Sequence, residues 1–180
     1  MSEHDRKTIL DSQGVAETLE RMAEEIVSQG PGVNNLVLVG IRTGGAYLAK
    51  RLKKIIKDKT GAEVPLGVVD INLYRDDWTR IGPKPRVGKT DLNFSIDNKR
   101  VVLVDDVLFT GRTVRAAMDA LMDFGRPARI ELAVLADRGH RELPICTNFT
   151  GLTVETSPEE RVNVYLSDLG HQDEVSLERK

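Results

Sequence analysis

Cysteine is almost missing from this sequence of 180 residues, which contains only Cys146. A single cysteine cannot form an intrachain disulfide, which is typical of a reducing compartment, so we expect a cytoplasmic protein. The three histidines, His4, His140 and His171, lack the spacing of metal ligands. No apolar run approaches the ~18 residues of a membrane span, and the polar N-terminus does not look like a signal peptide. We therefore expect no membrane association.

Excess charge of one sign is also missing, since the formal net charge is -2 and the pI is about 6.0. This excludes a chain built mainly to coat nucleic acid, although it leaves room for a local basic face. The 40% hydrophobic and 30% charged residues indicate a globular protein. We predict a single domain over residues 1–180 with a polar tail at 168–180, because this length suits one ordinary domain.

Short apolar runs alternate with segments of helical periodicity. Helices are predicted after Asp11, after Gly45 and over residues 112–124. Strands are predicted within residues 36–39, 64–74, 101–104, 130–136, 152–154 and 162–166. This order favours an α/β fold with a mostly parallel central sheet flanked by helices. Ligands bind beyond the carboxyl ends of the strands in such sheets, so the loops that follow them are the candidate sites.

The loop after residues 101–104 carries the strongest chemical signal. Asp105 and Asp106 follow the apolar run, and Thr110, Gly111 and Thr113 then open a helix. Unpaired N–H groups and the positive dipole end of a helix suit a phosphate. Two adjacent carboxylates need partners for their charge, such as vicinal sugar hydroxyls or a metal. Together these features indicate a ribose 5-phosphate site, although each alone is more often a solvated turn or an ordinary helix cap.

The complete string over residues 101–113 resembles the 5-phosphoribosyl diphosphate (PRPP) signature of type I phosphoribosyltransferases. Further strings at residues 73–77, 115–121, 125–127 and 137–145 look like the PyrR family. That family comprises uracil phosphoribosyltransferases, many of which also regulate pyrimidine operons by binding messenger RNA. The resemblance spans residues 9–166 and implies the type I phosphoribosyltransferase fold, with a small hood formed by the terminal segments.

The resemblance also implies roles for individual residues. Asp105, Asp106 and Arg75 would be catalytic, and Asp137 and Arg138 would face uracil. Mg²⁺ would be held through PRPP rather than by direct protein ligands. The implied partners are PRPP, uracil, UMP and diphosphate, in a homo-oligomer. The residues implied to bind PRPP or UMP are Arg42, Thr43, Gly44, Arg86, Asp105, Asp106, Val107, Leu108, Phe109, Thr110, Gly111, Arg112 and Thr113.

Residues 75–93 form a long polar stretch that we predict to be a mobile loop over the active site. By resemblance, its Arg75, Lys84, Arg86 and Lys89 would neutralise the leaving group. The alternative for Lys84, Arg86 and Lys89 is that they are solvated loop charges. Residues 82–90 look like a P-loop at first sight, but five residues separate the glycines where that motif has four. Two prolines and the lack of a following helix also exclude a P-loop.

One departure from the family concerns the diphosphate loop: Thr43-Gly44-Gly45 stands where RNA-binding members usually have Thr-Arg-Gly, so one arginine is absent and we expect diphosphate binding to survive with altered affinity. Two further departures concern RNA. Residues 146–152 contain no basic residue. The first helix is rich in glutamate, which repels a phosphate backbone. These features predict a uracil phosphoribosyltransferase with weakened or lost RNA regulation. Two alternatives stay open, an RNA-binding attenuator that senses UMP or PRPP with little catalytic role, and a transferase for another base such as a purine.

Overall fold

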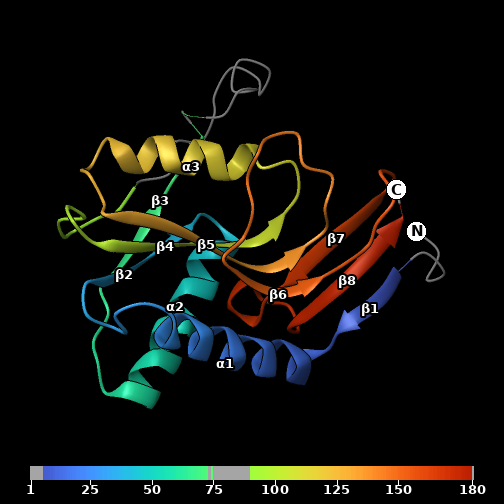
Figure 1. The fold of residues 1–180 in the computed structure, drawn as a ribbon. Helices are drawn as coiled ribbons and strands as arrows, with labels where there is room; N and C mark the ends of the chain where they lie inside the picture. Colours follow the sequence, from blue (N-terminus) through green and yellow to red (C-terminus); the bar gives the residue numbers. More distant parts are fainter. Residues whose placement is uncertain (1–5, 73, 75–89, 180) are drawn as a thin grey trace.

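The computed structural model describes residues 6–72, 74 and 90–179, which form two sheets and three α-helices (Figure 1). The elements in chain order are β1 (Arg6–Leu10), α1 (Ser12–Ser28), β2 (Leu36–Ile41), α2 (Gly44–Thr60), β3 (Leu66–Val69), β4 (Arg100–Leu108), α3 (Arg112–Met122), β5 (Arg129–Asp137), β6 (Phe149–Thr153), β7 (Glu160–Tyr165), a short 3₁₀ turn (Ser167–Leu169) and β8 (Glu174–Arg179). No helix among these residues is long and apolar enough to cross a membrane.

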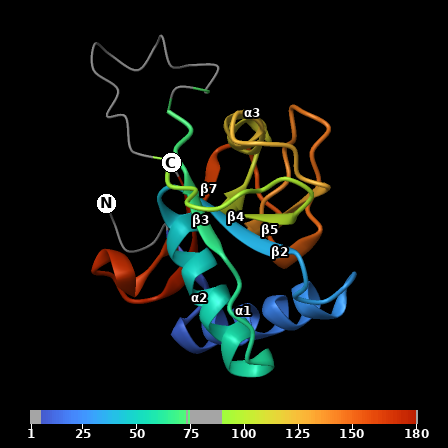
Figure 2. The same ribbon diagram turned by 90° about the vertical axis from the view of Figure 1, so that its left-hand side faces the viewer.

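The larger sheet has five parallel strands in the order β3-β2-β4-β5-β6. Helices α1 and α2 cover one face and α3 covers the other, as the side view in Figure 2 shows. Alternate residues of β4 serve the two layers: Val102 and Val104 pack toward α1 and α2, whereas Val101 and Leu103 pack toward α3. Burial on both faces explains why this strand is a continuous apolar run in the sequence.

Local signals fix the ends of the helices. The Asp11 carboxylate accepts a hydrogen bond of 2.8 Å from the Gly14 amide and caps α1. Helix α2 ends at Gly61, whose φ of 73° lies in the left-handed region that favours glycine. The predicted helices and the mostly parallel sheet are therefore confirmed, with small shifts of their ends.

The smaller sheet is antiparallel, in the order β1-β8-β7, and brings the two ends of the chain side by side (Figure 1). We call these three strands the hood, and the predicted hood of terminal segments is confirmed. The predicted polar tail at 168–180 is wrong, because β8 is the central strand of the hood and Val175 is fully buried. The sequence of β8 alternates polar and apolar residues from Glu174 to Glu178, so a half-buried strand looks polar on average.

A buried ion pair closes the end of the parallel sheet that lies opposite the carboxyl ends of its strands. The Arg100 guanidinium donates a hydrogen bond of 2.7 Å to Glu131 across β4 and β5, and another of 2.9 Å to the Ile26 carbonyl of α1. Both charged residues are buried. The hydrogen bond to Ile26 ties α1 to the sheet. Removing either partner of the ion pair would leave an uncompensated buried charge.

Candidate functional site

The parallel topology brings the carboxyl ends of β2, β3, β4 and β5 to the same edge of the sheet. Strand β4 is longer than the sequence predicts: it continues through Asp105 and Asp106 to Leu108, because its pairing with β5 extends to Asp137. The two acids therefore lie within the end of the strand rather than in the loop after it. Their backbone is held by the sheet, which fixes where their carboxylates stand.

The two acids have different environments. Asp105 is buried and accepts a hydrogen bond of 2.9 Å from the Asp106 amide. Burial, with a further contribution from the charge of Asp106, raises the pKa of Asp105 well above its usual value. Asp106 is half-buried and accepts a hydrogen bond of 2.8 Å from the Val107 amide. The site thus pairs one carboxyl group that resists ionisation with a more accessible carboxylate.

A small cavity of about 80 Å³ lies at the start of α3. Gly111 stands at the N-cap with a φ of 91° and offers no side-chain cap, and the Arg112 amide donates a long hydrogen bond of 3.3 Å to the Thr110 hydroxyl. The loop is held in shape from outside, because the Glu142 amide donates a hydrogen bond of 2.9 Å to the Thr110 carbonyl. A phosphate here would meet N–H donors and the positive dipole end of the helix. The lining residues are Asp105, Val107, Leu108, Phe109, Thr110, Gly111, Thr113 and Val114.

One residue of the predicted PRPP set has another partner. The Arg112 guanidinium donates a hydrogen bond of 2.7 Å to the Glu142 carboxylate, and Arg112 does not line the cavity at the start of α3. Both side chains are about half exposed. The structure therefore places Arg112 at the outer side of the loop, where it can hold residues 110–113 in place.

The loop after β2 brings a second group of donors to the same edge. The Arg42–Thr43 peptide is cis, and the Arg42 guanidinium lies 3.7 Å from the carboxylate of the buried Asp70 at the end of β3. Gly44 lies against Asp106: a Cβ at this position would stand 2.5 Å from the Asp106 carboxylate oxygen. Asp70 was not predicted as a site residue, although it follows an apolar run of the sequence as Asp105 does.

A larger cavity of about 290 Å³ lies between the end of β4 and the hood. The buried Arg138 stacks on Phe109 with 4.0 Å between its guanidinium carbon and the ring centroid. Burial and the nearby charge of Arg161 lower the pKa of Arg138. The lining residues are Val107, Phe109, Arg138, Pro158, Arg161, Val162 and Asn163. The sequence did not predict the four lining residues from 158 to 163, because no local signal indicates which strand of a distant hairpin will face a site.

Asp137, which was predicted to face uracil, and His140 are both bonded to neighbouring residues of the protein. Asp137 does not line the larger cavity; its carboxylate pairs with Arg141 at 2.5 Å and accepts a hydrogen bond of 3.0 Å from the Gly139 amide. His140 is bonded through its Nε2 to the Thr156 carbonyl at 2.6 Å and packs edge-on against Phe109. Both residues therefore shape the turn that carries Arg138.

Arg75, Lys84, Arg86 and Lys89 lie outside the described residues. Both neighbours of that segment are tied to the site. The Arg115 guanidinium of α3 donates a hydrogen bond of 2.7 Å to the Tyr74 carbonyl, and the Asp70 amide donates one of 3.0 Å to the Thr90 hydroxyl. Residues 90–93, predicted as part of the mobile loop, include an antiparallel bridge from Asp91 to Val68 of β3.

Acidic groups converge at the site without forming a metal cage. In the part of the chain that the structure describes, no group of three or more His, Cys, Asp or Glu side chains could hold a metal ion. The carboxylates at or near the ends of β3 and β4 are those of Asp70, Asp105 and Asp106. Such a donor set fits a hard cation that arrives with most of its oxygen ligands supplied by a substrate.

The fold and this arrangement define a phosphoribosyltransferase domain, and the model of the phosphoribosyl transferase domain family matches residues 5–169. The chain superposes on the HGPRT-ase of Leishmania tarentolae in complex with GMP with a TM-score of 0.70, covering 99% of this chain and 100% of that one at 16% identity. This likeness confirms the predicted type I phosphoribosyltransferase fold.

Sequence relatives specify the family further. The chain is 55% identical to the bifunctional protein PyrR of Geobacter sulfurreducens over 97% of this chain and 99% of that protein. It is 50% identical to the bifunctional protein PyrR of Syntrophobacter fumaroxidans over 99% of this chain and 96% of that protein. The chain belongs to the PyrR family, as its motifs predict.

We expect Asp105→Asn to stabilise the fold at neutral pH. The raised pKa of Asp105 means that ionisation favours the unfolded chain, so the penalty is absent at low pH and grows above about pH 4, the ordinary range of an aspartate. The Tm should rise by a few degrees at pH 7, since ~1 kcal/mol shifts the Tm of such a domain by roughly 2–4 °C. Thermal unfolding at pH 4.5 and pH 7 tests this, and a gain that is larger at pH 4.5 would contradict it.

Gly44 and Gly45 form a matched pair for mutation. A Cβ at Gly45 would collide with the Val104 carbonyl oxygen, which the sheet holds, so Gly45→Ala should lower the Tm by at least several degrees. A Cβ at Gly44 meets only the Asp106 side chain, which can rotate. Gly44→Ala should therefore keep the Tm and weaken PRPP binding by about tenfold, as when one charge-assisted hydrogen bond is lost. Equal losses of Tm in the two variants would contradict this distinction.

Proposed function

We propose that this protein transfers the phosphoribosyl group of PRPP to uracil, giving UMP and diphosphate. The observation that carries the proposal is the convergence of three features on one sheet edge. These are the acid pair near the end of β4, the start of α3 at Gly111 and the cavity between Arg138 and the hood. Membership of the PyrR family supports the same activity.

In this reaction N1 of uracil attacks the anomeric carbon as the bond from that carbon to the diphosphate oxygen breaks. The ribose gains oxocarbenium character, and the N1 proton leaves to solvent or diphosphate, so no enzyme nucleophile is needed. Asp105 and Asp106 would hold the ribose hydroxyls, and the start of α3 would hold the 5′-phosphate. Residues 42–44 would hold the diphosphate. Positioning and fixed charges can then supply most of the rate enhancement.

The cavity between β4 and the hood supports a flat base as the acceptor. Phe109 and Arg138 present an aromatic ring and a planar guanidinium, and both suit stacking on a pyrimidine. Asn163 and Arg161 line the same cavity with polar groups that can meet the exocyclic oxygens of uracil. The alternative, a purine acceptor, would need to fit the same space of about 290 Å³.

Mg²⁺ is the proposed cofactor. The ion would neutralise the charge that develops on the diphosphate and would be held chiefly by PRPP oxygens. Among the described residues, the Asp106 carboxylate is the accessible acid next to the diphosphate loop, because it lies against Gly44. This arrangement supports a metal that enters with its substrate rather than a resident metal.

We expect UMP formation from uracil and PRPP with Mg²⁺, and none from adenine, hypoxanthine or orotate. The double variant Asp105→Asn/Asp106→Asn should abolish use of PRPP while it stays folded, because it removes both ribose acceptors. Product analysis by chromatography tests this. Turnover with a purine alone would reassign the base, and saturable UMP binding without turnover with any base would favour the sensor function.

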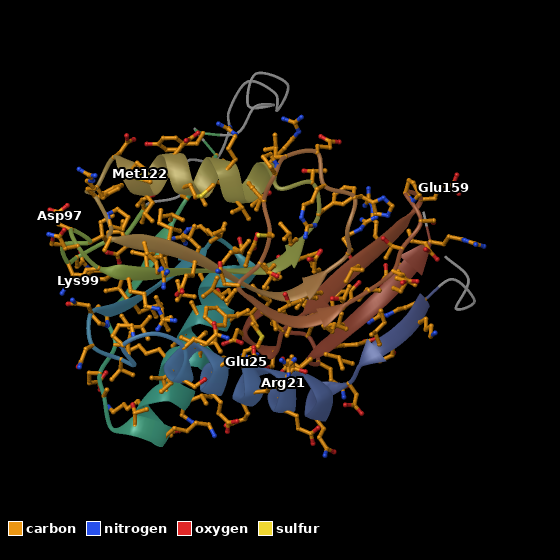
Figure 3. The ribbon with its side chains drawn as sticks, in the orientation of Figure 1. Arg21, Glu25, Asp97, Lys99, Met122 and Glu159 are labelled. Carbon is orange, nitrogen blue, oxygen red and sulfur yellow. The ribbon has the colours of Figure 1, made fainter. Side chains whose placement is uncertain are left out.

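We further propose that specific RNA binding is weak in this chain. Glu17, Glu20 and Glu24 lie exposed along α1. The one arginine of this helix is engaged, since Arg21 pairs with Glu25 at 2.7 Å and bonds the Gly151 carbonyl, and Figure 3 shows Arg21 and Glu25 on α1. Lys59 of α2 pairs with both Glu20 and Glu24, but the carboxylates on this face still outnumber the cations, so a phosphate backbone would meet net negative charge.

We expect the affinity for a pyrimidine-operon leader RNA to match the affinity for a scrambled RNA of equal length within about threefold at physiological salt. Fluorescence anisotropy with and without UMP measures both. A preference of a thousandfold or more for the leader, in the range typical of specific nucleic-acid binding, would overturn this proposal. The enzyme proposal would stand in either case.

A further inference from the structure

Arg51, the arginine of α2, links the hood to the five-stranded sheet and its helices, which we call the main domain. Arg51 donates hydrogen bonds to two carboxylates: its Nε lies 2.9 Å from Asp168, and its two terminal nitrogens lie 2.7 and 2.9 Å from the two oxygens of Asp173. One terminal nitrogen also donates to the Ser167 hydroxyl at 3.0 Å. We call Arg51, Ser167, Asp168 and Asp173 the hood clamp.

The clamp is more than a surface ion pair. The Arg51 and Asp173 side chains are only 21% and 17% exposed, so water screens them less than exposed charges. The guanidinium binds Asp173 through both carboxylate oxygens, which is the stronger geometry for this pair. Hydrogen bonding to Arg51 lowers the pKa of Asp173, so this carboxylate remains ionised at neutral pH.

The acceptor side of the clamp is a preformed turn. It connects β7 to β8, and its Asp173 accepts a hydrogen bond of 2.6 Å from the Ser167 amide. The start of α1 contributes as well, because the Ser12 hydroxyl donates 2.9 Å to the Asp173 carbonyl. Three elements of the main domain and hood therefore meet at one carboxylate residue.

The position of the clamp relates it to the site. Strand β7 enters the turn directly, and its Arg161, Val162 and Asn163 form the hood side of the proposed base cavity. Helix α2, which carries Arg51, begins at Gly44 in the proposed diphosphate loop. The same rigid helix thus reaches both the diphosphate loop and the support of the base cavity.

We propose that Arg51 is a positioning residue for the base, which holds β7 at the distance from Phe109 and Arg138 that fits a pyrimidine. This inference rests on the proposed function. Arg51 itself does not line either cavity of the site. Its loss should therefore loosen one wall of the base cavity and leave the ribose and phosphate contacts unchanged.

The test compares Arg51→Ala and Arg51→Lys with the wild type. In Arg51→Ala the KM for uracil should rise about tenfold, as expected when a support is displaced by a fraction of an ångström. The KM for PRPP should stay within about twofold. Arg51→Lys should recover part of the loss, because an ammonium group keeps the charge but cannot bind two carboxylates and a hydroxyl in one plane. Hydrogen exchange should accelerate in β7 and β8 but not in β2 or β4.

The matched control is Lys59→Ala, which removes a cation of the same helix that pairs with Glu20 and Glu24 of α1 rather than with the hood. It should change neither KM. A folded Arg51→Ala variant with unchanged KM for uracil would overturn the inference, even if its Tm falls. If the wild type does not use uracil, the proposed function fails instead. The affinity for UMP, measured by calorimetry on the same variants, then decides the role of Arg51.

Discussion

The close approach of the loop after β2 to the end of β4 is the constraint on which the site depends. Gly45 packs on the Val104 carbonyl with no space for a Cβ, and Gly44 lies beside Asp106. Parallel pairing of β2 with β4 sets this distance, because their register runs from Leu36↔Arg100 to Gly40↔Val104. The proposed diphosphate loop and ribose acceptors are therefore brought together by backbone packing rather than by attraction between their side chains, two of which are carboxylates.

The acid pair shows that the site is kept at a cost to stability. Asp105 is buried next to another carboxylate, and both effects disfavour its ionised form. A residue chosen for folding alone would be apolar here, as its neighbours Val104 and Val107 are. Burial shields the carboxyl group from water and the Asp106 amide orients it, which suits the proposed contact with a ribose hydroxyl.

The hood lies opposite the carboxyl ends of the parallel strands and closes one side of the larger cavity. It is assembled from the first and last described strands, β1 and β8, with β7 beside them. The cavity next to Arg138 exists only because β7 stands across from Phe109. In the proposed function, the ribose and phosphate contacts belong to the sheet edge and the base contacts belong to the boundary between the two sheets, so these two functions can change separately.

The sequence by itself determined the parallel sheet, its helices and the loop at residues 105–113. Each of these has a local signal: apolar runs for buried strands, periodic apolar residues for α1 and α3, and the ordered string of acids, hydroxyls and glycine. The family resemblance added Arg42, Gly44 and Arg138 to the site.

Only the tertiary structure decided the rest. It showed β8 as the centre of the hood, Asp70 beside Arg42, and Arg161 and Asn163 in the cavity wall. It also separated Arg112 and Asp137 from the cavities, because Glu142 and Arg141 bind their charges. These outcomes depend on contacts between segments far apart in the chain. Local patterns record the burial and periodicity of a segment, but they do not record which distant segment will face it.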